Sequence, residues 1–152
     1  MNLFYVHSDP RICAQMHHDK HIVKMILEYA QILSTAHRVL DGELYTELSK
    51  KGRKVKRWKL QDSRENVLYK ATHVNHPSTV WARQSQNNYN WLYCLFVYCC
   101  EEYTHRYGKV HATAKKLANI LILSPENIPD GLPLTYPPQC MPDKYKAKHP
   151  ID

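Results

Sequence analysis

Apolar and polar positions alternate with a helical period along residues 17–35. The apolar residues point in almost every direction around a helix axis, which predicts a central helix that is buried on most of its circumference. The polar residues recur every three or four positions and therefore line one face over roughly 27 Å. This polar stripe consists of His17, Lys20, His21, Lys24, Glu28, Gln31 and Thr35. Imidazole, ammonium and carboxylate groups on a buried helix favour a cleft, and the alternative is a solvated face held by Lys24 and Glu28.

Helix start and stop signals flank this segment. Asp9 and Pro10 predict an N-cap and a first helical residue. The helix that begins there either continues into the central helix or bends near residues 17–19. Asp41 followed by Gly42 ends the central helix.

Three more helices are predicted further along the chain. Pro77 starts a short helix, because the residue before a proline is held extended. Ser85 or Asn88 caps a helix over residues 89–107, whose apolar centre should pack directly on the central helix, and Gly108 ends it. A last helix covers about residues 110–121.

The remaining segments are predicted to be extended. Residues 2–6 are β-prone and predict a short N-terminal strand, and residues 43–60 predict a hairpin with Gly52 in its turn. Residues 124–152 are rich in proline and predict an extended tail that wraps the core, with Tyr136, Cys140 and Met141 as anchors. The expected fold is therefore mainly α: a compact single-domain helical bundle over residues 1–152 with a short strand, a basic hairpin and a tail.

The net charge of +7 comes from one segment. Residues 50–59 carry seven positive charges and no negative one, which leaves 14 basic and 14 acidic residues elsewhere. A localised basic patch is typical of proteins that bind polyanions, although such a run can also be a solvated loop. Lys54, Lys56 and Arg57 could lie along a phosphate backbone, and Trp58 either stacks on a base or closes the hairpin over the core.

Composition excludes several classes of protein. Four glycines are too few for a phosphate-cradling loop, so phosphate recognition must use side chains. The longest apolar run has ten residues, half of what a membrane span needs, and no secretory segment opens the chain. Five cysteines without a CxxC pair fit a reducing compartment, so we expect a cytoplasmic protein. His73 and His76 have a zinc-like spacing but no accompanying motif, so no metal and no cofactor is predicted.

Three parts of the chain carry candidate phosphate-binding groups. The central helix supplies Lys20 and Lys24 beside His21 and Glu28, and we expect other basic residues to face them. Those residues are His73, His76 and Arg83 from the middle segment and Arg106, Lys109 and His111 from the end of the third helix onward. Burying so many titratable groups requires either a ligand or dense mutual pairing, and both alternatives are open.

Four segments resemble a family of small proteins carried by tailed bacteriophages: HHDKHIVKMILEYAQILSTAHR, YKATHVNHPSTVWARQSQNNYNWLY, EEYTHRYGKVH and YPPQCMPDKYK. The order of a first helix, an NHP motif and a helix ending in RYGK is also similar to pyrimidine-dimer DNA glycosylases of the endonuclease V type. That resemblance implies a compact all-α fold, an N-terminal α-amine as the nucleophile and a carboxylate on the first helix. In this chain the amine would be that of Met1, and the carboxylate would be Glu28 or Asp19, with His21 beside them.

Three functions are compatible with these features. The first is an enzyme acting on DNA in an infected bacterial cell, namely a glycosylase or lyase for a damaged or modified base. The second is a protein that binds or hydrolyses a nucleotide, including an anti-defence protein that removes a host nucleotide signal. The third is a non-enzymatic interaction protein used in host takeover. The basic hairpin favours the first function, and ten histidines in 152 residues favour the second.

Overall fold

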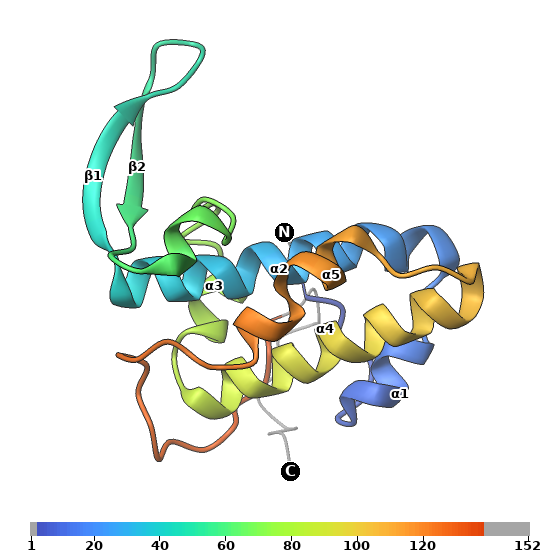
Figure 1. Ribbon diagram of the computed structural model, residues 1–152. Helices are drawn as coiled ribbons and strands as arrows, with labels where there is room; N and C mark the ends of the chain where they lie inside the picture. The colour runs from blue at the N-terminus through green and yellow to red at the C-terminus, as the bar shows by residue number, and fades with distance from the viewer. Residues whose placement is uncertain (1–2, 139–152) are drawn as a thin grey trace.

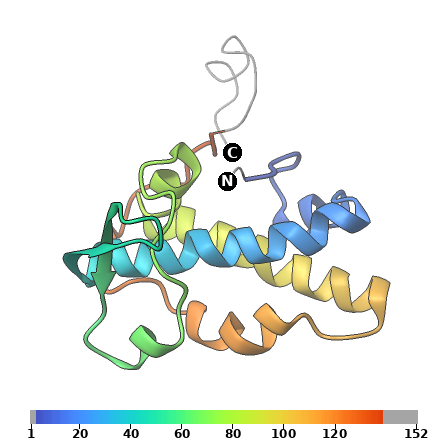
Figure 2. The same ribbon diagram turned by 90° about the horizontal axis from the view of Figure 1, so that it is seen from above.

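The computed structural model describes residues 3–138 as a mainly helical single domain with one two-stranded hairpin. Two long helices, α2 (Asp19–Asp41) and α4 (Gln86–Tyr107), form its centre and cross each other (Figures 1 and 2). They pack directly through fully buried side chains that include Ile26 and Phe96. The predicted contact between these two helices is therefore confirmed.

Helix α4 begins three residues earlier than the predicted residue 89. The Ser85 hydroxyl accepts a hydrogen bond from the Asn88 amide at 3.0 Å, so Ser85 rather than Asn88 is the N-cap. The helix ends at Gly108, whose φ of 70° is a left-handed conformation that glycine adopts without strain.

The first helix bends instead of continuing into the central one. Helix α1 (Pro10–Gln15) is capped by Asp9, and α2 starts only at Asp19. The His17 carbonyl at the bend accepts a hydrogen bond from Arg106 at 2.7 Å, so the last turn of α4 satisfies a backbone group that the interrupted helix leaves free.

The two short helices lie on opposite sides of α2. Figure 2 shows α3 (Pro77–Ala82) on the same side as the N-terminal segment, and α5 (Ala112–Leu121) on the other side. Helix α5 starts two residues after the predicted position, because the His111 side chain accepts from the Thr113 amide at 3.1 Å and acts as the N-cap.

The basic hairpin projects from the body at the C-terminal end of α2 (Figure 1). Strands β1 (Glu43–Leu48) and β2 (Lys54–Lys59) pair antiparallel, and Gly52 has a φ of 78° in the turn. A 3-10 helix, η1 (Ser63–Asn66), follows. The predicted hairpin and the residue in its turn are confirmed.

The predicted N-terminal strand is wrong for the part of it that the structure describes. Residues 3–6 form no strand, and the hairpin lies at the other end of α2. Leu3 and Tyr5 are instead buried in the core, and the Phe4 amide donates to the Tyr29 hydroxyl at 3.2 Å. The β-prone composition reflects burial here and not sheet formation.

The tail wraps the core as far as it is described. Thr135 binds both Trp81 Nε1 and Asn88 Nδ2 through its hydroxyl at 3.0 Å, and the Tyr136 ring packs on Tyr5. The predicted anchors Cys140 and Met141 lie outside the described residues.

Candidate functional site

The polar stripe of α2 is open at its N-terminal half and covered at its C-terminal half. The Lys24 side chain is 72% exposed and that of Glu28 is 18% exposed, whereas Thr35 is buried. The Thr35 hydroxyl donates to the Thr72 carbonyl and accepts from the Thr72 amide, so the segment before α3 lies across this end of the stripe. The stripe is therefore neither a solvated face along its whole length nor an open cleft.

Two histidines at the N-terminal end of the stripe differ in their surroundings. His17 is buried, with Nδ1 bonded to the Cys13 carbonyl and Nε2 to the Tyr29 hydroxyl, both at 2.8 Å. Burial lowers the pKa of His17 to about 4, so it is a neutral structural group. His21 is half-buried, stacks on His17 and contacts the Phe4 ring; burial also lowers its pKa. Of the two imidazoles, only that of His21 is accessible to a ligand.

Glu28 has a carboxylate oxygen that accepts no hydrogen bond from the described residues. Its Oε2 is buried and has no hydrogen-bond donor among the described residues, and Lys24 Nζ lies 3.9 Å away. A buried carboxylate oxygen without a hydrogen bond is costly, so this oxygen is a candidate acceptor for a substrate hydroxyl or proton.

The segment around α3 supplies a second set of candidate side chains, those of His73, His76 and Arg83. His73 is exposed at a φ of 49°, and His76 caps α3 by accepting from the Ser78 amide. Arg83 is half-buried, and its only hydrogen bond among the described residues goes to the Val74 carbonyl at 2.8 Å. Burial lowers the Arg83 pKa, and no carboxylate among the described residues pairs with this guanidinium. Among residues 3–138, no group of three or more His, Cys, Asp or Glu residues could hold a metal ion.

Arg106, Lys109 and His111 do not form one cluster with His73, His76 and Arg83, contrary to our expectation, and Arg106 meets the polar stripe only at its N-terminal end. Arg106 binds Glu102 and Asp19 by ion pairs of 3.0 and 3.1 Å and donates to two carbonyls at the bend between α1 and α2. His111 caps α5 on the opposite side of α2, and Lys109 is exposed in the connection before it. These positions follow from helix ends, where side chains pair with free backbone groups.

The hairpin residues also include exposed side chains and side chains that bind other parts of the protein. Lys54 and Lys56 are exposed, as is Lys20 on α2. Arg57 instead donates to Glu47 at 3.0 Å and to the Ala71 carbonyl at 2.7 Å, so its guanidinium fixes the hairpin to the body. Trp58 is half-buried, which matches neither a fully stacked nor a fully closed position.

Two buried arginine networks were not expected from the sequence. Arg38 is 4% exposed and donates five hydrogen bonds, to the Glu65 carboxylate and to the carbonyls of four residues. Arg64 pairs with Asp41 and Asp62 and donates to His37, which in turn binds the Tyr89 hydroxyl at 2.8 Å. Position 38 continues the polar stripe three residues after Thr35, and that spacing was the signal that could have revealed Arg38.

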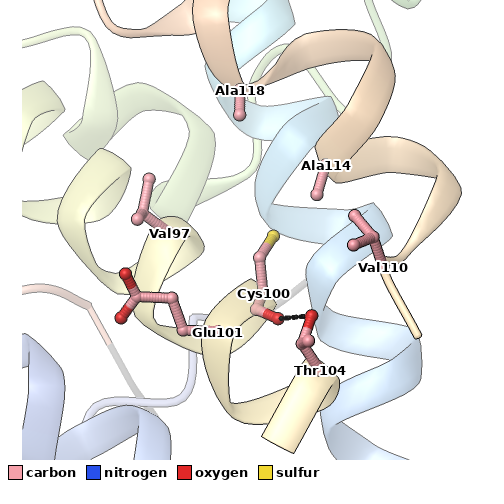
Figure 3. A pocket seen from close by; sticks show the side chains of 7 residues that line it. All are labelled: Val97, Cys100, Glu101, Thr104, Val110, Ala114 and Ala118. Carbon is pink, nitrogen blue, oxygen red and sulfur yellow. Dashed lines mark hydrogen bonds between the residues drawn. The ribbon is translucent and has the colours of Figure 1, made fainter. Parts of the chain in front are cut away.

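One groove lined by described residues is apolar and lies away from these groups. It has a volume of about 330 Å³ between α4 and α5, with Val97 and Cys100 facing Ala114 and Ala118 (Figure 3). A smaller polar cavity of about 140 Å³ lies under the hairpin beside Arg57 and Lys70. Neither contains an activated nucleophile with a neighbouring base, so neither is a catalytic site by geometry.

Comparison with known proteins gives no match. No family model fits the sequence, and no curated protein and no solved structure is significantly similar to it. None of the helices within residues 3–138 is long and apolar enough to cross a membrane.

Proposed function

We propose that this protein binds nucleic acid and acts on DNA as a glycosylase or lyase. The observation that carries the proposal is the hairpin, which projects from the body and carries the excess of positive charge, with Arg57 as the one of these charged groups that binds the body within residues 3–138. Lys50, Lys51, Lys54 and Lys56 are all exposed and have no ion pair among the described residues. A projecting basic ribbon of this kind suits contact with a phosphate backbone.

Salt dependence tests the binding step. Replacing Lys50, Lys51, Lys54 and Lys56 by Gln should weaken duplex binding and flatten the slope of log K against log salt by about 0.9 per lost contact. Lys115→Gln is the control, because this exposed lysine lies on α5, on a different side of the molecule. An unchanged slope in the fourfold variant would remove the hairpin from the interface.

The chemical step is assigned to the open half of the polar stripe. A neutral amine attacks C1′ of the flipped nucleotide, the glycosidic bond breaks, and the base leaves with the bonding electrons and takes up a proton. Loss of a proton and opening of the sugar then give an imine. Glu28 would orient the sugar, and His21 would exchange protons. The Met1 amine is the proposed nucleophile, because an α-amine with an ordinary pKa near 8 is partly neutral at physiological pH; Met1 lies outside the described residues.

Reductive trapping tests this chemistry. With borohydride and an oligonucleotide that contains an abasic site or a pyrimidine dimer, the protein should form a covalent adduct whose protein half maps to the N-terminus. Glu28→Gln should reduce the yield, whereas Glu101→Gln, an exposed carboxylate on α4, should not. Absence of any adduct with either substrate rejects the lyase and leaves nucleic-acid binding to be judged by the salt experiment.

A second function, binding of a free nucleotide as in an anti-defence protein, is favoured by Arg83. A half-buried guanidinium that pairs with no carboxylate within residues 3–138 is suited to a phosphate group, and His73 and His76 precede it on the same segment. Nucleotides that raise the melting temperature of the wild-type protein should fail to do so for Arg83→Ala. If no nucleotide, cyclic or linear, raises it, this second function is rejected.

A further inference from the structure

The two faces of the hairpin have different surroundings. Because side chains alternate along a strand, Tyr45, Glu47 and Arg57 share one face. This inner face is tied to the body: Arg57 binds Glu47 and the Ala71 carbonyl, and Lys70 Nζ lies 3.6 Å from Glu47. The opposite face, which we call the outer face, consists of three cross-strand pairs: Leu44 with Trp58, Thr46 with Lys56, and Leu48 with Lys54.

The outer face combines exposed apolar side chains with positive charge. Leu44 is 56% exposed and Leu48 is 69% exposed, and Trp58 beside them is half-buried and also lines the polar cavity under the hairpin. In a hairpin packed on one side only, solvent-facing positions are normally polar. Two exposed leucines and a tryptophan on a projecting ribbon therefore indicate a surface that binds a partner.

We propose that the outer face binds a single-stranded segment of nucleic acid, with unpaired bases on Trp58, Leu44 and Leu48 and phosphates on Lys54 and Lys56. The inference rests on the proposed function and deepens it. The seven positive charges of residues 50–59 select a polyanion. The apolar side chains select a polyanion whose bases are unpaired. A duplex presents mainly phosphates and sugars to a flat ribbon, whereas an unpaired strand offers the faces of its bases for stacking.

The arrangement of charges favours a nucleic-acid strand over a membrane surface as the partner of the outer face. Lys54 lies directly opposite Leu48, and Lys56 lies one pair further along the ribbon. The charges are therefore among the apolar side chains and do not form a rim around them. Two lysines on one strand face are about 7 Å apart, which is close to the spacing of neighbouring phosphates along one nucleic-acid strand.

Tryptophan fluorescence gives a direct test. The chain has three tryptophans, and Trp81 and Trp91 are only 2% and 7% exposed, so quenching by a ligand reports on Trp58. A single-stranded oligothymidylate should quench the emission of the wild-type protein and leave that of Trp58→Phe unchanged. The double variant Leu44→Ser, Leu48→Ser should lose roughly tenfold or more in affinity for the same probe while keeping its salt slope.

The matched control separates this inference from the proposed function. Lys50→Gln with Lys51→Gln, in the turn, should weaken single-strand and duplex binding alike and flatten both salt slopes. Helical circular dichroism should be unchanged in all variants, since the substituted side chains are exposed or half-buried.

Two results would overturn the inference alone. One is single-strand affinity that is equal in the wild-type protein and in the double leucine variant while duplex binding persists. The other is Trp58 emission that responds to vesicles containing phosphatidylserine but not to the oligonucleotide, which would assign the face to a membrane. If the wild-type protein binds neither single-stranded nor duplex DNA, the proposed function fails together with the inference.

Discussion

Three arginines show how strongly the role of a residue depends on what surrounds it. Arg38 and Arg106 donate to carbonyls and carboxylates of the protein itself, whereas Arg83 makes one hydrogen bond in the part of the chain that the structure describes. The first two join elements that are distant in sequence. Within residues 3–138 Arg83 keeps donors without a partner, which is why the proposed nucleotide binding assigns the phosphate to this arginine.

Stability measurements on two variants check this distinction. Arg106→Ala should destabilise the protein by about 3 kcal/mol, because it leaves Glu102 and two carbonyls at the bend without their donor. Arg83→Ala should cost about 1 kcal/mol, since it removes one hydrogen bond and part of the packing. Urea unfolding of both variants gives the comparison, and equal losses would contradict it.

Two buried histidines link stability to pH. His17 and His37 are each at most 2% exposed, and burial lowers the pKa of both from 6.5 to about 4. Between about pH 6.5 and about pH 4 these two imidazoles are protonated in the unfolded chain and neutral in the folded protein. The stability that these two groups confer is therefore complete above pH 6.5 and is lost as the pH falls towards 4.

Unfolding at two pH values measures this effect. Lowering the pH from 7 to 5 should reduce the free energy of unfolding by roughly 3–4 kcal/mol for the two sites together. The double variant His17→Asn, His37→Asn should be less stable at pH 7 but should lose most of the difference between the two pH values. Wild-type stability that is the same at pH 5 and pH 7 would be inconsistent with buried neutral imidazoles.

At the scale of elements, two glycines end the long helices for different reasons. Gly108 is needed for its backbone conformation, with a φ of 70° and open space where a side chain would lie. Gly42 is needed for space, because a Cβ there would lie 2.5 Å from the Arg38 carbonyl and 3.1 Å from Trp58 Cβ. Close approach at Gly42 allows the hairpin to turn back against the end of α2.

Replacing each glycine by alanine distinguishes the need for a left-handed backbone from the need for space. Gly108→Ala should reduce the free energy of unfolding by about 1 kcal/mol, because a residue with a side chain is strained in the left-handed conformation. Gly42→Ala should cost about 2–3 kcal/mol, because backbone atoms must move. It should also raise the exposure of Trp58 and shift its emission, which Gly108→Ala should not do. A smaller loss for Gly42→Ala than for Gly108→Ala would refute this account.

At the scale of the whole molecule, one core joins all the helices. Residues from the N-terminal segment, α2, α4, α5 and the tail contribute to a single cluster of buried side chains, among them Leu3, Tyr29, Leu92, Leu117 and Ile128. Such a chain should unfold cooperatively, since no group of helices has a core of its own.

Two spectroscopic probes test this cooperativity. Helical circular dichroism and the fluorescence of buried Trp81 and Trp91 should follow one denaturation curve with a single midpoint. Trp58→Phe removes the hairpin signal from the fluorescence and serves as the reference protein. Separate midpoints for the two probes in that variant would show that the helices do not share one core.

The sequence by itself determined the local features of this protein. Helical periodicity, caps such as Ser85 and the stop at Gly108 are set by neighbours within a few residues, so the two long helices and the hairpin were predictable. The sequence also located the excess charge on the hairpin.

Only the tertiary structure decided which polar side chains meet. His111 was expected beside His21, but it caps a helix on the far side of α2, and Arg106 closes the bend between two helices. The β-prone segment near the N-terminus became core because no strand edge was within reach. These outcomes depend on which donors and acceptors the packing brings together from distant parts of the chain, and the periodicity of one segment carries no information about that.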